Sequence, residues 1–230
     1  MKKEFKYIVF DADDTLWMNE TLFRETEGKL CDLLKEYAGQ EEVMRILYQL
    51  EMKNLEYYGF GIKGFMLSMM ETALQVSKGC IDASCIESIL VMGKAQLAHP
   101  VELLPEVKGT LRELKAYYPL VLATKGDLLD QERKIRLSGL KDLFCHVEVM
   151  SDKNDEAYAH LFKSIGAVPG DILMVGNSMK SDILPILKLG GSAVYIPFHT
   201  TWIHEVVEED VEHDNLVQLE SIGQLKQLLL

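Results

Sequence analysis

The chain has 230 residues, enough for one large domain or for one domain with a smaller insertion. With 48% hydrophobic residues and a mean hydropathy near zero, its composition is typical of an ordinary globular protein. The formal net charge of −12 disfavours a nucleic-acid partner, because binding a phosphate backbone requires surfaces rich in Lys and Arg. A small anionic substrate is compatible with this charge if a metal ion or a local Lys offsets it.

The cysteines and the N-terminal segment bear on the cellular compartment of the protein. Cys31, Cys80, Cys85 and Cys145 show no repeated pair spacing and no companion histidines, so no zinc site is expected. Reduced thiols, buried as small hydrophobic side chains, favour a cytoplasmic protein. The apolar run before Asp11 is too short for a signal peptide, and no segment is long enough to span a membrane. No membrane association is therefore predicted.

The first predicted element is a short buried strand over residues 7–10, rich in β-branched and aromatic side chains. It ends abruptly in an acidic turn, Asp11-Ala12-Asp13-Asp14-Thr15. Open α/β sheets place their ligands just past the carboxyl ends of their strands. Carboxylates crowded into one turn repel one another unless a cation holds them. The turn therefore predicts a metal site; the alternative is a strand followed by a solvated acidic turn.

Residues 17–100 show a helical pattern. Apolar side chains recur at helical spacing in four successive stretches, within 22–37, 43–50, 65–74 and 86–97. A glycine-rich stretch, 59–64, interrupts the series and is predicted to be a loop. Because no proline occurs between Met1 and His99, we expect this block to form a compact helical bundle.

From Pro100 onward, short apolar strands alternate with helices. The predicted strands are 120–124, 146–150, 172–176 and 193–196; the predicted helices are 109–117, 129–138, 156–165 and 181–189, with a final helix at 221–230. This alternation predicts an α/β fold with a doubly wound parallel sheet, which also contains the first strand. The predicted domains are an α/β core of residues 1–16 and 101–230 and an inserted α-helical cap domain of residues 17–100.

Parallel strands bring their carboxyl ends to one edge of a sheet, so polar groups far apart in the sequence converge there. The four strand ends are 11–15, 124–127, 151–153 and 176–182. Together they supply carboxylates, a hydroxyl and an ammonium group. These groups suit phosphoryl transfer, because an Asp can attack phosphorus, Thr and Lys can bind the equatorial oxygens, and acids can hold Mg²⁺.

This ordered set resembles the haloacid dehalogenase-like (HAD) superfamily, whose Rossmann-like core is marked by an Asp-x-Asp-x-Thr turn, a Thr or Ser after the second strand, a Lys, and a Gly-Asp-x-x-x-x-Asp motif. The resemblance covers essentially the whole chain, and the first motif is complete in residues 11–15. One position departs from the pattern. Asn177 stands where the family often has Asp, so the metal shell has one negative charge fewer, although the amide oxygen can still coordinate.

The resemblance implies roles for both acids of the turn. Asp11 is expected to be the nucleophile that forms an aspartyl-phosphate, and also a Mg²⁺ ligand. Asp13 is expected to protonate the leaving oxygen and then to deprotonate the hydrolytic water, while its backbone carbonyl binds the metal. The metal lowers the pKa of Asp11, whereas the Asp13 carboxyl, which lies away from the metal, can keep its proton long enough to act as an acid.

The resemblance also implies supporting residues. Thr15 braces the turn, Thr124 donates a hydrogen bond to the phosphoryl group, and Asp182 with Asn177 completes the metal shell. Lys153 offsets the phosphoryl charge and orients Asp11; its rivals are Lys163, on the outer face of a predicted helix, and Lys125, which follows Thr124 and is expected to contact substrate or cap. Asp14 and Asp152 are interpreted as turn or helix-cap residues, and the acidic run 205–212 as a solvated surface.

In this superfamily, helical caps inserted after the first motif close over the site and select the leaving group, which excludes bulk water. The cap side chains predicted to face the site are Asn19, Tyr57, Tyr58, Lys63 and Phe65. A closing cap implies a small phosphorylated metabolite as the partner.

The sequence therefore predicts a Mg²⁺-dependent phosphatase that hydrolyses a small phosphate monoester, such as a sugar phosphate or nucleotide. A dehalogenase of the same superfamily lacks the second Asp of the turn, so Asp13 argues against that alternative. A phosphonate hydrolase needs a cap lysine, for which Lys63 is the candidate, and a phosphomutase remains an alternative. A non-catalytic sensor of a phosphorylated ligand is disfavoured because Asp11 and Asp13 are both present.

Overall fold

The computed structural model describes residues 4–230, so residues 1–3 of the predicted core segment lie outside it. The chain divides into two compact units. The larger holds the chain up to Glu20, Val101–Lys125 and Gln131–Leu230, and the smaller holds Thr21–Pro100 and Gly126–Asp130. The domain boundaries predicted from the sequence, after residues 16 and 100, stay a prediction. The compact units assign residues 17–20 to the larger unit and Gly126–Asp130 to the smaller one.

The larger unit is built on a six-stranded sheet in the order β3-β2-β1-β4-β5-β6, with every neighbouring pair parallel. The strands are β1 (Tyr7–Phe10), β2 (Leu120–Lys125), β3 (His146–Met150), β4 (Ile172–Gly176), β5 (Ser192–Tyr195) and β6 (Leu216–Gln218). The predicted α/β fold class with a parallel sheet is confirmed. The strand β6 was not predicted, because three residues, two half-buried and one exposed, carry no strand-like periodicity.

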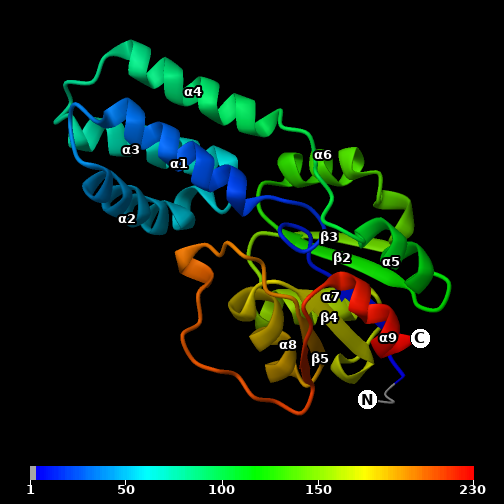
Figure 1. The fold of residues 1–230 in the computed structure, drawn as a ribbon. Helices are drawn as coiled ribbons and strands as arrows, with labels where there is room; N and C mark the ends of the chain where they lie inside the picture. Colours follow the sequence, from blue (N-terminus) through cyan, green and yellow to red (C-terminus); the bar gives the residue numbers. More distant parts are fainter. Residues whose placement is uncertain (1–3) are drawn as a thin grey trace. The chain divides into compact units, whose positions relative to one another are not determined.

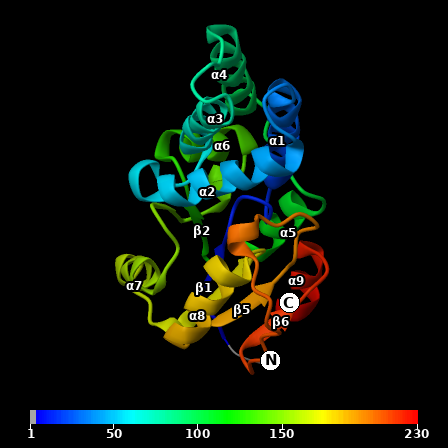
Figure 2. The same ribbon diagram turned by 90° about the vertical axis from the view of Figure 1, so that its left-hand side faces the viewer.

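Helices cover both faces of the sheet (Figure 2). Along β1, Ile8 and Phe10 pack into one hydrophobic cluster with α5 (Val107–Leu114) and α9 (Leu225–Leu229), whereas Val9 packs into a second cluster with α7 (Asp155–Ser164) and α8 (Leu184–Leu189). Alternate side chains of one strand thus face opposite layers, as the period of a β-strand requires. This arrangement confirms the doubly wound topology.

The register of the central strands brings their carboxyl ends to one edge. Phe10 of β1 is paired with Leu122 of β2 and with Val175 of β4. The next residue, Asp11, donates its backbone N–H to Val175 O at 2.9 Å. The acidic turn therefore begins in the middle of the sheet, between the ends of two neighbouring strands.

The segment after β4 differs from the predicted regular helix 181–189. A π-helical turn, Met179–Ile183, comes first, and α8 begins only at Leu184. Such wide turns occur frequently at functional sites. Here the turn brings Asp182 against Gly176, where a Cβ atom would lie 2.3 Å from Asp182 Oδ2. Only glycine leaves room for this carboxylate.

The smaller unit contains the four predicted helices: α1 (Glu20–Leu34, whose first residue lies in the larger unit), α2 (Gln40–Tyr58), α3 (Ile62–Val76) and α4 (Ala83–Leu97), as Figure 1 shows. Their inward faces form one hydrophobic core that includes Leu30, Val43, Met69 and Ile89. Because α3 begins at Ile62, the glycine-rich loop is shorter than predicted. Gly59 and Gly61 have φ angles of 66° and 112°, which glycine adopts without steric strain.

All four cysteines are free thiols. Only Cys31 is buried, so the expectation of buried thiols is wrong for the exposed Cys80 and Cys145. Within residues 4–230, no helix is both long enough and apolar enough to cross a membrane.

Candidate active site

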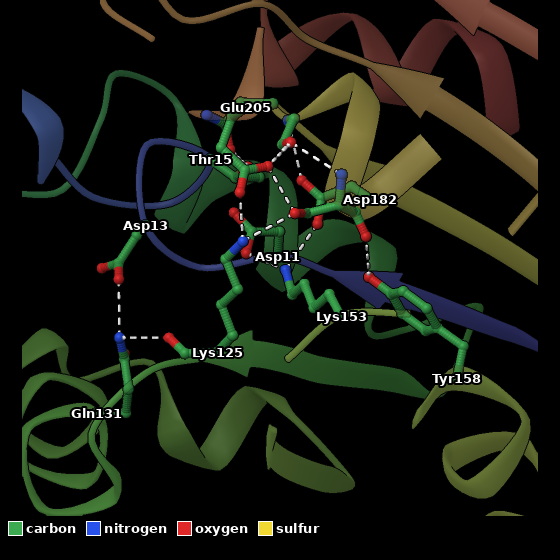
Figure 3. A network of polar contacts seen from close by, with 12 residues as sticks. Asp11, Asp13, Thr15, Lys125, Gln131, Lys153, Tyr158, Asp182 and Glu205 are labelled. Carbon is green, nitrogen blue, oxygen red and sulfur yellow. Dashed lines mark hydrogen bonds and ion pairs between the residues drawn. The ribbon is translucent and has the colours of Figure 1, made fainter. Parts of the chain in front are cut away.

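Three buried charged side chains lie at the centre of the sheet edge (Figure 3). Lys153, in the loop after β3, contributes an ammonium group that forms ion pairs with Asp11 Oδ1 and, at 2.6 Å, with Asp182 Oδ1. The exposed fractions are 5% for Lys153, 6% for Asp11 and 1% for Asp182. The structure thus brings together three predicted site residues that lie far apart in the sequence, and it selects Lys153 over the exposed Lys163.

Burial dominates the electrostatics of this cluster. Burial, together with the neighbouring charge of Asp182, raises the pKa of Asp11 to about 7 against the opposing effect of Lys153. Burial alone would lower the pKa of Lys153, but Asp11 and Asp182 outweigh that effect and raise it well above its ordinary value. Lys153 therefore stays charged, and the ionised form of Asp11 depends on nearby positive charge.

Asp13 is held by three hydrogen-bond donors. Its carboxylate accepts hydrogen bonds from Trp17 Nε1 at 2.7 Å, Gln131 Nε2 at 2.8 Å and Lys134 Nζ at 2.9 Å. Burial alone would raise the pKa of Asp13, but the charge and hydrogen bond of Lys134, together with the other donors, lower it. This arrangement favours the carboxylate form of Asp13, and its predicted role as a proton donor stays a prediction.

Gln131 and Lys134 are site residues that the sequence analysis missed. They lie three positions apart on one face of α6 (Leu128–Ser138), the helix that follows β2, and this spacing is a signal that could have been used. Lys134 Nζ also donates to Asn19 Oδ1 at 2.7 Å. Asn19, predicted to be a cap residue, thus lies in the larger unit beside Asp13. Gln131 Oε1 is buried without a hydrogen-bond partner among the described residues, so it can accept one from a ligand.

Asn177 faces a group of oxygen atoms. Its Oδ1 accepts a hydrogen bond from Thr15 Oγ1 at 3.1 Å. The same position of the amide is 3.1 Å from Asp13 O and from Asp11 Oδ2. With its nitrogen in that position, the amide donates hydrogen bonds to these oxygens. With its oxygen there, that oxygen lies 3.1 Å from Asp13 O and from Asp11 Oδ2, close to the roughly 3 Å that separates adjacent ligands in an octahedral Mg²⁺ shell.

This donor set fits the predicted metal. Mg²⁺ prefers carboxylate, carbonyl and amide oxygens, which are the groups that Asp11, Asp13 and Asn177 present. No group of three or more His, Cys, Asp or Glu side chains within residues 4–230 could hold a metal ion, so a site here would depend on the backbone carbonyl and the amide. Asp182 Oδ2 accepts the backbone N–H of Ser178 at 3.0 Å, while its other oxygen faces Lys153.

The predicted phosphoryl-binding residues lie at the end of β2. Thr124 is buried, with an exposed fraction of 1%. Its hydrogen bond to the phosphoryl group stays a prediction. Lys125 Nζ donates to Ser181 Oγ at 2.8 Å and forms an ion pair with Glu205 at 2.5 Å. The interpretation of residues 205–212 as a wholly solvated surface is therefore wrong for Glu205, which is 9% exposed. Its donors lie far away in sequence, so the local pattern could not reveal it.

The remaining cap predictions fall in the smaller unit. Tyr57 and Tyr58, at the end of α2, are exposed. Lys63, in the first turn of α3, forms an ion pair with Asp127 at 2.9 Å. The prediction that Phe65 faces the site is wrong, because it is buried in the core of the bundle, 5.0 Å from the ring centroid of Phe23.

Comparisons with known proteins confirm the resemblance. A family model for haloacid dehalogenase-like hydrolases matches residues 5–190. N-acylneuraminate-9-phosphatase of Rattus norvegicus is 27% identical over 209 residues, covering 86% of this chain and 82% of the relative. The 5-amino-6-(5-phospho-D-ribitylamino)uracil phosphatase YigB of Escherichia coli is 22% identical over 200 residues, covering 82% of each chain. A haloacid dehalogenase-like family hydrolase from Xanthomonas campestris has a solved structure with a TM-score of 0.88 and 34% identity, covering 99% of this chain and 91% of that one.

The burial of Asp14 makes the stability of the protein depend on pH. Its carboxylate accepts the backbone N–H groups of Asn19 at 2.8 Å and of Glu20 at 2.9 Å, so it caps the start of α1 as predicted. Burial, with a contribution from the charge of Asp13, raises the pKa of Asp14 to about 7 against these hydrogen bonds. Between the ordinary pKa of 3.8 and about 7, the folded state keeps a proton that the unfolded state has lost. Stability from this group therefore falls as the pH rises through that window.

We expect Asp14→Asn to remove that loss, because Asn is neutral and tolerates the positive φ of 62° at this position. Thermal unfolding midpoints in EDTA should rise relative to wild type at pH 8 and change less at pH 5. Asp210→Asn, at an exposed position, is the control. An equal shift at both pH values would contradict the raised pKa.

Proposed function

The chain belongs to the haloacid dehalogenase-like hydrolases, and we propose that it is a Mg²⁺-dependent phosphatase that hydrolyses a small phosphate monoester through an aspartyl-phosphate. The observation that carries the proposal is the buried set of Asp11, Lys153 and Asp182, with Asp13 two residues beyond the nucleophile. Both named relatives described above are phosphatases, which supports the same class of reaction here.

The residues that would hold Mg²⁺ are Asp11, Asn177 and Asp182, together with the backbone carbonyl of Asp13. When bound, the ion supplies positive charge that favours the ionised form of Asp11 and offsets the charge of a phosphate group. This contribution matters in a buried cluster where the pKa of Asp11 is about 7. Asn177 in place of an acid leaves a neutral ligand at one position.

The proposed reaction takes place in two steps. In the first, a carboxylate oxygen of Asp11 attacks phosphorus, the bond from phosphorus to the alcohol oxygen breaks, and Asp13 donates a proton to that oxygen. In the second, Asp13 takes a proton from a water molecule that attacks the phosphorus of the aspartyl-phosphate. Inorganic phosphate leaves, and Asp11 is regenerated. Throughout, Lys153 and Thr124 are proposed to stabilise the negative charge on the transferring group.

The hydrogen bonds around Asp13 favour the form needed in the second step. Lys134, Gln131 and Trp17 stabilise a carboxylate, which is a proton acceptor. For the first step Asp13 has to carry a proton, so we propose that substrate binding releases at least one of these donors. This proposal gives the helix α6 a part in the acid–base cycle.

We propose a small phosphorylated metabolite as the substrate. The names of both relatives specify phosphate groups on small organic molecules, and the net charge of −12 disfavours a polyanionic nucleic acid. Specificity is proposed to reside in the helical bundle of the smaller unit. We keep Tyr58 and Lys63 as candidate contacts.

Two alternative activities are less well supported. A dehalogenase needs no second Asp, because a halide leaves without a proton, whereas here Asp13 is held by three donors. A phosphonate hydrolase needs a lysine activated by desolvation. Lys63 is instead half-exposed and paired with Asp127.

The nucleophile can be tested directly. We expect Asp11→Asn to lower kcat for p-nitrophenyl phosphate by about 10³-fold or more, because an amide oxygen cannot form the phosphoenzyme. EDTA should abolish wild-type turnover, and added Mg²⁺ should restore it. Asp142→Asn, at an exposed position, is the control. Metal-independent turnover, or an active Asp11→Asn variant, would contradict the proposal.

The role of Asp13 predicts a dependence on the leaving group. Asp13→Asn should lower kcat by about 10²–10⁴-fold for glycerol phosphate, whose alkoxide needs a proton. The loss should be smaller for p-nitrophenyl phosphate, since nitrophenolate leaves unprotonated. Single-turnover rates isolate the first step. Equal losses for the two esters would remove the acid role from Asp13.

A further inference from the structure

A buried carboxylate, that of Glu205, connects the segment between β5 and β6, residues 196–215, to the site. Glu205 accepts hydrogen bonds from Lys125 Nζ at 2.5 Å, from Ser181 Oγ at 2.5 Å and from Ser178 Oγ. Figure 3 shows the side chain of Lys125 extending toward Glu205, in the same network as Asp11 and Asp182. The three donors come from two strand ends, since Lys125 ends β2 and both serines follow β4.

The surroundings of Glu205 indicate that this burial is specific. Its neighbours Ile203 and Val206 are 59% and 51% exposed, and Glu208 and Glu209 are exposed as well. The segment therefore lies at the surface on both sides of one buried acid. The preceding residue adds a second attachment to the same turn, because Lys180 Nζ donates to His204 O at 2.8 Å.

A continuous series of contacts leads from Glu205 to the nucleophile. Ser178 donates its hydroxyl to Glu205, and its backbone N–H donates to Asp182 Oδ2 at 3.0 Å. The other oxygen of Asp182 is paired with Lys153, which is paired with Asp11. Ser178 Oγ also accepts the backbone N–H of Ser181 at 3.0 Å, so the hydroxyl that Glu205 orients closes the π-helical turn.

The charge on Glu205 is permanent at neutral pH. Burial alone would raise its pKa, but Lys125 and the two serine hydroxyls lower it to about 2. Glu205 is thus an acceptor that cannot compete for protons with the acids of the site. It also neutralises Lys125, the residue next to the predicted phosphoryl ligand Thr124.

We propose that Glu205 is a positioning residue of this active site. Through Ser178 and Ser181 it holds the π-helical turn between Asn177 and Asp182, and through Lys125 it joins that turn to the end of β2. A π-helical turn is a rare and locally irregular conformation, so an external brace stabilises it. The catalytic consequence rests on the proposed phosphatase function, whereas the effect on the turn does not.

The test compares Glu205→Gln, which keeps the shape but removes the charge, with Glu208→Gln, the same change at an exposed position of the same segment. We expect Glu205→Gln to lower kcat by about 10–100-fold at saturating Mg²⁺, with a smaller change in KM, as for residues that orient ligands from outside the site. Amide hydrogen exchange in residues 177–183 should accelerate in this variant only. Glu205→Asp should recover part of both effects.

The pathway through Ser178 is tested by a double-mutant cycle. If Glu205 acts through that hydroxyl, the losses of kcat in Glu205→Gln and Ser178→Ala are not additive in the double variant. Should Glu205→Gln not fold, the variant Lys125→Gln/Glu205→Gln removes both charges of this ion pair, and the same measurements apply to it with Lys125→Gln as the reference.

Two outcomes would overturn the proposal. One is a lower thermal midpoint for Glu205→Gln with kcat and exchange in residues 177–183 equal to those of Glu208→Gln, because Glu205 would then only attach a surface segment. The other is additive losses in the double-mutant cycle. If the wild type hydrolyses no phosphate ester, the proposed function fails, and the exchange comparison still decides whether Glu205 holds the turn.

Discussion

The ion pairs of Lys153 with Asp11 and Asp182 are the interaction on which the rest of this site depends. Two buried carboxylates near one ammonium group would repel each other strongly without it, because a dry interior screens charge poorly. Several local features of the chain support this arrangement. Gly176 leaves space for the carboxylate of Asp182, and the wide turn after it aims that carboxylate back toward the sheet. With two acids and one lysine, the cluster remains suited to a second cation.

The parallel sheet supplies the rigid frame for this chemistry. Asp11 follows the central strand, whose neighbours on both sides also end in site residues. Asp11 and Thr124 therefore begin at backbone positions fixed by hydrogen bonds between strands, whereas Lys153 and Asp182 lie in the segments that follow β3 and β4. A second group of residues contacts the site residues from outside this frame. Lys134 and Gln131 on α6 stabilise the ionised form of Asp13, and Glu205 reaches the turn that carries Asp182.

The fold and the centre of the site could be predicted because their signals are local. Short apolar strands alternating with helices identify the sheet, and an acidic turn after a strand identifies its functional edge. Lys153 and Asp182 could be placed because they follow strands at the spacing of a known family. The spacing of Gln131 and Lys134 indicates a shared helix face but not its partner, since Lys134 lies 121 residues from Asp13 and only the packing of α6 brings them together.

Glu205 is a clearer example of a residue whose contacts cannot be predicted from a local sequence pattern. In the sequence it opens an acidic run, which normally indicates a solvated surface, and its lysine partner lies 80 residues away. The π-helical turn was likewise outside the reach of pattern analysis, because apolar periodicity there suits an ordinary helix. In each case a long-range contact determines the local structure. Phe65 was misplaced for a related reason: proximity to a glycine-rich loop suggested an exposed role, whereas helical packing buries its ring.

The most direct measurement compares the free energies of unfolding, by urea at pH 8 in EDTA, of Lys153→Met and of the triple variant Asp11→Asn/Lys153→Met/Asp182→Asn. Removing only the lysine leaves two facing buried carboxylates, so we expect a loss of about 3–5 kcal/mol. Removing all three charges should recover most of that loss. A single variant as stable as the wild type, or a triple variant no more stable than the single one, would contradict the account.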